Sequence, residues 1–469
     1  MTAPDPVLGF MTKMANLGGV VVQDQPKLDL DLYLQNYVGR TRFDRLLHIG
    51  KMSVYLCVDA LRAAVIEAKK GHDVLCYLEA LECLKEAAPD VPEAQRDSDW
   101  VHKTEAENKA ETARLENELK GYTNNLIKES IRMGNEDLGK HFEDIGKLKE
   151  ATEAYTRMRH DVSTTKHIRD CGKHLVNVSL HRRDFKSVLS SVSMLASAQA
   201  SNNEESMKAH TVIGSLLAHL GLGNFEEAVK ELLGTNFNEP PTMYNHMASP
   251  NDIAIYGGLL ALATMDREKL RAHVLEHQTF RIFLEHEPHI RRAIGFFVGA
   301  RYSSCLSILE ASRPDFLLDI HLQKHVPEIF AKIRSKCIVQ YFVPFSCVAL
   351  ETLDAAFASP GTSIVHEVAE KIRDGSLKAR IDAKEKLLVA VEPDSRESMQ
   401  SNALKVARLY EKEAKERLRH MSLALSGLGV VDVRKAASAD PGAPPVDEAW
   451  FDEMSDTHVG YAGTVVAQS

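Results

Sequence analysis

Apolar residues recur at every third or fourth position over most of the chain, which is the spacing of one buried face of an α-helix. Between residues 43 and 84 this spacing predicts three successive helices. Residues 100–120 carry many charges and few large apolar side chains, a pattern typical of a long helix with a solvated face. Residues 1–27 show no consistent period, and we expect them to form a flexible N-terminal arm.

Three segments in the middle of the chain share a weak repeat. In each, a loop residue is followed two positions later by an apolar anchor, and then by small or apolar residues at helical spacing. The anchors are Leu148, Phe185 and Phe225, which lie 37 and 40 residues apart. A period of this length accommodates two antiparallel helices per unit, as in tetratricopeptide-like repeats. The repeat therefore predicts a mainly α fold with a right-handed helical-repeat solenoid over residues 28–240.

Alternation of apolar and polar residues, the mark of a half-buried strand, is clear in one place only. Two alternating stretches are separated by a polar turn, and their apolar positions are Leu377, Ala379, Ile381, Leu387, Val389 and Val391. Two short amphipathic helices precede this hairpin. The order helix, helix, two-stranded wing predicts a winged-helix module over about residues 344–393, preceded by a helical part over about 241–343.

The last helix is predicted over residues 394–426 and carries a heptad-like seam. The apolar or small residues of this seam are Met399, Ala403, Ala407, Tyr410, Ala414, Leu418, Met421 and Leu425. Residues 427–469 contain three prolines and many small and acidic residues, so we expect a disordered tail. We predict subunit contacts at the wing, through Leu387, Val389 and Val391, and at the larger seam residues Met399, Tyr410, Leu418, Met421 and Leu425.

Composition excludes several classes of function. The chain of 469 residues has 57 basic and 66 acidic side chains, a net charge of −9, and so lacks the basic surface that binds nucleic acid. Its seven cysteines are scattered, which indicates buried thiols in a reducing compartment rather than a disulfide framework. No apolar stretch reaches the roughly 20 residues that span a bilayer, and the start of the chain lacks signal-peptide features. We expect a soluble intracellular protein with no nucleic-acid or membrane partner.

One string suggests metal chemistry. His273, Glu276 and His277 form an H-x-x-E-H pattern. On one continuous helix the two histidines would share a face and could bind zinc, with Glu276 as general base, as in inverted zinc peptidases. Such a site also needs an acidic ligand from another helix, and no second motif identifies one. A zinc peptidase is thus the alternative function of another class, while we expect no catalytic residue, no metal site and no cofactor.

A helical-repeat array that leads into a winged helix resembles the plan of PCI-domain proteins. Within that group, a set of strings resembles the family of subunit 1 of the COP9 signalosome. The strings include Leu-Asp-Leu at 28–30 with Tyr33 and Tyr37, Ile-Lys-Glu-Ser-Ile-Arg at 127–132, Ile-Tyr-Gly-Gly-Leu at 255–259, Ala-Leu-Ala-Thr at 261–264 and Gln-Tyr-Phe at 340–342. The resemblance covers roughly residues 20–425 and assigns residues 241–393 to the PCI domain.

The resemblance implies a non-catalytic scaffold subunit of a complex that removes Nedd8 from the cullins of cullin-RING ubiquitin ligases. It implies that the metalloprotease activity lies in a subunit of the MPN type, and this chain indeed has no His-x-His pair. The expected partners are other PCI and MPN subunits, and cullin-RING ligases through the complex, in nucleus and cytoplasm. The alternative within the same class is the PCI subunit of the proteasome lid.

Overall fold

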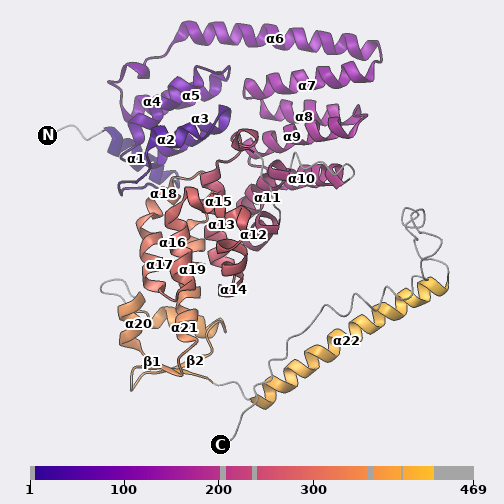
Figure 1. Ribbon diagram of the computed structural model, residues 1–469. Helices are drawn as coiled ribbons and strands as arrows, with labels where there is room; N and C mark the ends of the chain where they lie inside the picture. Colours follow the sequence, from indigo (N-terminus) through magenta and orange to yellow (C-terminus); the bar gives the residue numbers. More distant parts are fainter. Residues whose placement is uncertain (1–5, 201–207, 235–239, 358–362, 392–394, 427–469) are drawn as a thin grey trace, which may run out of the picture. The chain divides into compact units, whose positions relative to one another are not determined.

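The computed structural model describes residues 6–200, 208–234, 240–357, 363–391 and 395–426 of the chain (Figure 1). It divides into two compact units, Met1–Ala390 and Val391–Ser469, which are described separately. Helices make up most of the described residues, with one small antiparallel sheet. The predicted fold class, a helical-repeat array followed by a winged helix and a final helix, is confirmed. No described helix is long and apolar enough to cross a membrane.

The first part of the chain forms a helical module with its own core. Its elements are α1 (Pro6–Asn16), α2 (Leu30–Gln35), α3 (Gly39–Met52), α4 (Cys57–Ala68), α5 (Val74–Ala87) and the 3₁₀ turn η1 (Pro92–Ala94). We call residues 6–101 the N-terminal module, because the buried side chains of this stretch gather in one cluster. Phe10 and Met11 of α1 are buried in it. Residues 6–16 therefore differ from the flexible arm that was expected, because these two apolar side chains find a place in the core.

A long helix, α6 (Ser98–Asn124), leads from this module into a row of helical hairpins (Figure 1). The hairpins pair α7 (Lys128–Asp144) with α8 (Leu148–His160), α9 (Thr165–His181) with α10 (Phe185–Ala200), and α11 (Lys208–Leu222) with α12 (Phe225–Gly234). Each helix packs against the next one along the chain. The predicted anchors Leu148, Phe185 and Phe225 are the first residues of α8, α10 and α12, so the repeat is structural.

The hairpin turns share one backbone geometry. The residue two positions before each anchor has a positive φ: +80° at Gly146, 58° at Arg183 and +80° at Gly223. In each turn the next backbone N–H donates to the carbonyl five residues back, at 2.8 to 3.0 Å. This is the Schellman arrangement that ends a helix and satisfies its last carbonyls. The loop residue of the sequence repeat is therefore the left-handed residue of this turn.

The array continues beyond the hairpins in a stretch that ends at Phe342. Its elements are η2 (Pro241–Met243), α13 (Pro250–Thr264), α14 (Arg267–Leu270), the π-helical turn η3 (Arg271–Leu275), α15 (Gln278–His286), α16 (Pro288–Val298), α17 (Tyr302–Ala311), α18 (Arg313–Leu317) and α19 (Val326–Phe342). We call α7 to α19 the helical array. Helix α13 lies at its centre, because α12, α15, α16 and α19 all pack against it.

Two glycines allow this close packing. A Cβ atom at Gly257 would lie 2.6 Å from Leu232, and one at Gly258 would lie 2.3 Å from Ile290. Both distances are too short for real carbon contacts. The absence of a side chain at these two positions is therefore what lets α12 and α16 lie close to α13.

The winged-helix module completes the first unit. It contains β1 (Cys347–Ala349), α20 (Leu350–Phe357), α21 (Val365–Arg373), β2 (Ala379–Asp382) and β3 (Leu387–Ala390). The sheet order is β1-β3-β2, with both pairings antiparallel. In the second unit, α22 (Ser395–Leu425) is a single helix of 31 residues.

The hydrophobic cores do not follow the predicted domain boundaries. One cluster holds the N-terminal module, a small one extends from Leu115 to Val178, and the largest extends without a break from Val176 to Leu388. The largest cluster crosses residue 240 because α12 packs directly on α13. The boundaries at 240, 393 and 426 therefore stay predictions, and the predicted disordered tail, 427–469, lies outside the described residues.

Candidate functional site

The wing differs from the prediction in one respect, because the sheet has three strands. The sequence predicted a two-stranded wing, in which β3 would pair with β2 alone. Instead, Val389 lies opposite Arg380 of β2 on one side and opposite Cys347 of β1 on the other. Strand β1 has only three residues, too few for alternation to be visible in the sequence. The free edges of the sheet therefore belong to β1 and β2, and β3 is the central strand.

The two faces of the sheet differ in burial. Leu388 is fully buried, and Val348 and Ala379, on the same face, are also buried. The predicted contact residues Leu387 and Val389 are half-buried on the opposite face. Residues directly opposite each other across strands share a face, so Cys347 and Arg380 lie beside Val389, and both are exposed. Val391 follows β3 and is 52% exposed.

Helix α22 presents its predicted seam to solvent. The exposed fractions of the predicted contact residues are 76% for Met399, 74% for Tyr410, 65% for Leu418, 62% for Met421 and 90% for Leu425. These five residues recur at heptad positions and lie on one side of the helix. The second unit contains no other described helix or strand. Among the described residues of this unit, no other element offers the seam an apolar partner.

The sequence prediction missed part of the apolar surface of this helix. Leu404 and Val406 are also exposed, and at about 100° per residue they widen the seam on its two sides. Leu409 and Leu423 are exposed on the opposite side of the helix. A helix in a simple two-stranded coiled coil needs only a narrow apolar stripe. The wider distribution on α22 is typical of a helix with several neighbours.

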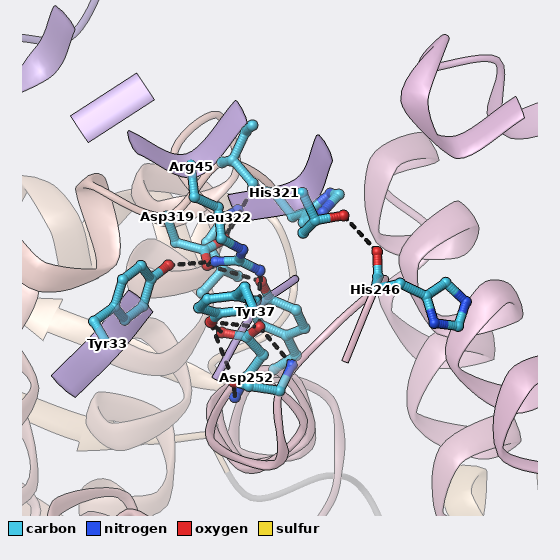
Figure 2. Close-up of polar contacts among 12 residues, drawn as sticks. Tyr33, Tyr37, Arg45, His246, Asp252, Asp319, His321 and Leu322 are labelled. Carbon is cyan, nitrogen blue, oxygen red and sulfur yellow. Dashed lines mark hydrogen bonds and ion pairs between the residues drawn. The ribbon is translucent and has the colours of Figure 1, made fainter. Parts of the chain in front are cut away.

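A buried polar cluster joins the N-terminal module to the helical array (Figure 2). Arg45 of α3 is 1% exposed and forms two ion pairs. Its Nη2 lies 2.8 Å from Asp252 Oδ2 on α13, and its Nη1 lies 2.9 Å from Asp319 Oδ2 in the turn after α18. We call Arg45, Asp252, Asp319 and the three tyrosines around them the Arg45 hub.

The tyrosines complete the hydrogen bonding of the hub. The Tyr37 hydroxyl donates to Asp252, and the Tyr256 hydroxyl donates to Asp319, both at 2.8 Å. The Tyr33 hydroxyl oxygen accepts from Arg45 Nη1. The Arg45 guanidinium also lies over the Tyr37 ring, 4.2 Å from its centroid. A buried charge is tolerated only with such partners, since its transfer from water is very costly.

The two carboxylates of the hub respond differently to burial. Burial raises the pKa of Asp252 above its ordinary value, although Arg45 opposes this shift. At Asp319 burial acts in the same direction, but the charge of Arg45 and the hydrogen bond from Tyr256 outweigh it and lower the pKa. Asp319 therefore carries the negative charge that balances Arg45 most firmly. The hub therefore holds α3 against α13 and against the turn after α18 by ion pairs and hydrogen bonds. Its role is to position these elements.

The residues of the hub form no recognisable site in the sequence. Tyr33, Tyr37 and Tyr256 occur in the strings that carry the family resemblance, but nothing in the sequence connects them with Arg45. Asp252 and Asp319 lie 207 and 274 residues away from Arg45 along the chain. An ion pair over such a separation leaves no local pattern.

The H-x-x-E-H string does not lie on one helix. His273 belongs to the π-helical turn η3, Glu276 follows that turn, and His277 is the N-cap of α15. His277 Nδ1 accepts a hydrogen bond from the backbone N–H of Phe280 at 3.4 Å. The geometric premise of the zinc alternative, two histidines one turn apart on a continuous helix, is therefore wrong. Over the described ranges, no three potential ligands gather into a metal site.

Two family models match successive parts of the chain. The family model of 26S proteasome subunit RPN7 matches residues 97–273, and the model of the PCI domain matches residues 301–392. The first match covers α6, the hairpins, α13, α14 and the start of η3, so it crosses residue 240, and the second covers α17 to the wing.

Curated relatives match over nearly the whole chain. COP9 signalosome complex subunit 1 of Neurospora crassa is 49% identical over 432 residues, which is 92% of this chain and 95% of the relative. Subunit 1 of Emericella nidulans is 45% identical, over 91% of this chain and 88% of the relative. Subunit 1 of Arabidopsis thaliana is 34% identical, over 88% of this chain and 95% of the relative. The chain therefore belongs to the COP9 signalosome complex subunit 1 family.

Proposed function

We propose that this protein is a non-catalytic scaffold subunit of the COP9 signalosome, the complex that removes Nedd8 from the cullins of cullin-RING ubiquitin ligases. The observation that carries the proposal is the exposed apolar seam of α22 in a chain of this family. The proposed partners are the PCI and MPN subunits of the complex, and cullin-RING ligases through it. The proposed location is the nucleus and the cytoplasm, which microscopy of a fluorescent fusion would test.

The seam needs a partner on energetic grounds. Burial of one side chain of this size contributes about 1.5–3 kcal/mol. The five predicted contact residues of the seam would together supply several kcal/mol after the loss of side-chain entropy is subtracted. Charged residues alternate around the rest of the helix, for example Lys405, Lys412 and Glu416, and suit the solvated rim of a helical bundle.

The wing supplies a second proposed contact. The outer face of its sheet carries the half-buried Leu387 and Val389, and the strands β1 and β2 each leave one row of backbone groups unpaired by the sheet. Natural proteins cover such edges or use them to add a strand from a partner. We propose that a neighbouring PCI subunit covers this face.

Co-purification tests the proposal. The tagged chain, expressed in cells of its own species, is expected to capture signalosome subunits identified by mass spectrometry. The double variant Leu418→Asp with Met421→Asp places two charges in the seam and is expected to lower that recovery at least about tenfold. The matched control Lys405→Gln with Lys412→Gln lowers the net charge by the same amount as the double variant but replaces no apolar side chain, so it should leave recovery unchanged.

The same variants separate two roles for α22. If the seam binds other subunits, the isolated double variant keeps the melting temperature of the wild-type chain. If the helix instead folds back and stabilises its own chain, the melting temperature falls by several degrees. Unchanged recovery of signalosome subunits by the double variant would contradict the proposed role of the seam.

The proteasome lid remains the second candidate, because the RPN7 family model matches residues 97–273. The curated relatives that match over about nine-tenths of the chain carry the signalosome name. Recovery of lid subunits in the co-purification, without signalosome subunits, would decide for the lid. Cleavage of a neddylated cullin by the isolated chain, lost in His273→Ala, would decide against a non-catalytic subunit.

A further inference from the structure

The N-terminal module and the helical array have separate hydrophobic cores. The module's cluster of buried side chains includes Leu46, Leu61 and Leu81. Among the described residues of the helical array, the buried Leu318 belongs to this cluster and the partly buried Leu317 packs against it. The array's own clusters contain no described residue before Leu115. Apolar burial therefore stabilises each part internally and contributes little to holding the two together.

Polar contacts dominate the boundary between the two parts. They include Arg45 to Asp252 and Asp319, Tyr37 to Asp252, Thr41 to the His246 carbonyl, and the Lys27 N–H to Asp315. His181 of α9 lies 3.7 Å from Asp44 of α3. Thr41, Asp44 and Arg45 lie at i, i+3 and i+4, so one face of α3 makes most of these contacts. The Arg45 hub is the most deeply buried of them.

The boundary also contains two open clefts. One, of about 460 Å³, lies between Arg40 and Asp73 of the module and Glu143 and His181 of the array. The other, of about 500 Å³, lies between the Tyr33 segment and α13, α16 and α18. Charged side chains from both parts line each cleft, so solvent reaches charged groups at the edge of the boundary.

A single helix makes the covalent connection. The chain leaves the module through α6, which is 27 residues long. Val101 near its start belongs to the module's core, and Leu115 further on belongs to a core of the array. Few of its other side chains are buried. The module can therefore move relative to the array with the chain intact.

From these observations we propose that the N-terminal module can detach from the helical array as a folded unit. The Arg45 hub is the latch, that is, the contact that holds the module against the array. Helix α6 keeps the two parts covalently connected when they separate. Removal of the Arg45 charge leaves two buried carboxylates without a cation, and breaking a buried ion pair in this way strongly favours solvation of the partners. Opening of the boundary gives both carboxylates access to water. The module's own core is not involved in that change.

Distance measurement between two spin labels tests the latch. Nitroxides are attached to Leu75→Cys in the module and Met133→Cys in the array, in a full-length chain that also carries Cys347→Ser and Cys83→Ala. Leu75 and Met133 are both well exposed, so the labels do not disturb a core. In the otherwise unchanged chain a single narrow distance is expected. In Arg45→Met, the fraction of molecules outside that distance should rise from a few per cent to more than about half.

A matched control removes an arginine that does not cross the boundary. Arg62 pairs with Glu93 at 2.9 Å inside the module, so Arg62→Met should keep the narrow distance. Hydrogen exchange of α4 and α5 is measured on the same samples and should stay as slow in Arg45→Met as in the parent chain. If Arg45→Met does not yield soluble protein, Asp319→Asn, which keeps the side-chain shape, is measured instead.

Two outcomes would overturn the proposal. An unchanged narrow distance in the hub variant would show that the module stays docked without the latch. Faster exchange throughout α4 and α5 would show that the module unfolds when the hub is lost, so it would not be a unit that can be released.

Discussion

A left-handed residue sets each hairpin turn of the array, and its identity varies. Gly146 and Gly223 adopt the positive φ without strain, whereas Arg183, and Ala300 in the turn before α17, adopt it at 58° and 59°. A Cβ atom makes the left-handed region unfavourable by roughly 1–2 kcal/mol. In the sequence repeat, Gly146, Arg183 and Gly223 are not all of one residue type, and what marks their position is the apolar anchor two residues later.

Reciprocal substitutions test this account. A Cβ atom at Gly223 would meet nothing within 4 Å, so Gly223→Ala tests the backbone alone. We expect it to lower the free energy of unfolding by about 1 kcal/mol, and Ala300→Gly to raise it by about 0.5 kcal/mol, after the extra entropy of glycine in the unfolded chain. Urea denaturation followed by circular dichroism measures both. Shifts of the same sign in the two variants would contradict the account.

At the scale of single residues, the sequence predicted features that depend on neighbouring residues in the chain. Leu148, Phe185 and Phe225 begin helices as predicted, because the turn and the helix that follows are short-range structures. The Arg45 hub was not predicted, since its charges come from α3, α13 and the turn after α18. Its partners become neighbours only when the helical array has folded.

At the scale of elements, the wing shows why short strands escape prediction. The alternation over residues 377–391 revealed β2 and β3, but the three-residue β1 could not be distinguished from the end of α19. The missing strand changed the conclusion about β3, which is central. The seam of α22 was predicted well because a heptad pattern over 31 residues is long enough to be clear.

The central position of β3 gives a prediction about proline. Val389→Pro removes a backbone donor from a strand that pairs on both sides, and proline is tolerated only at edges or strand ends. We expect a loss of roughly 2–3 kcal/mol in the stability of the winged-helix module. The control Lys378→Pro lies just before the edge strand β2 and should cost much less. Hydrogen exchange of residues 379–390 measures the difference, and equal loss in both variants would contradict a central β3.

At the scale of the whole molecule, buried histidines make stability depend on pH. Burial lowers the pKa of His48 to about 4, that of His246 to about 4 and that of His210 to about 3. Burial also lowers the pKa of His321, which lies beside Arg183 and Asp319. The four histidines come from α3, α11 and two connecting segments, and all are neutral in the folded chain at pH 7.

The sign of the effect follows from where protons bind. In the unfolded chain a histidine takes up its proton near pH 6.5. In the folded chain His48 and His246 do so only near pH 4, His210 near pH 3, and His321 well below pH 6.5. Between these limits the unfolded state holds more protons, so acidification favours it. Stability is thus complete above pH 6.5 and falls towards pH 4, by up to about 1.4 kcal/mol per pH unit for each histidine.

Buried carboxyl groups act in the opposite direction. Burial raises the pKa of Asp252, Glu143 and Asp144, so the folded chain binds these protons before the unfolded chain does. Their effect extends from the ordinary carboxyl range near pH 4 up to their raised pKa values, so it offsets part of the histidine effect. A variant that removes one of the histidines therefore isolates the contribution of that histidine.

We predict that the melting temperature of the full chain falls steadily between pH 7 and 5. His246→Asn should flatten the curve, because one shifted histidine is removed while its backbone carbonyl still accepts the hydrogen bond from Thr41. Differential scanning calorimetry of the two proteins in the same buffer series measures the slopes. The account fails if the melting temperature is constant or rises over this interval, or if the variant's curve runs parallel to that of the wild type, since the buried histidines would then not be the groups that bind protons on unfolding.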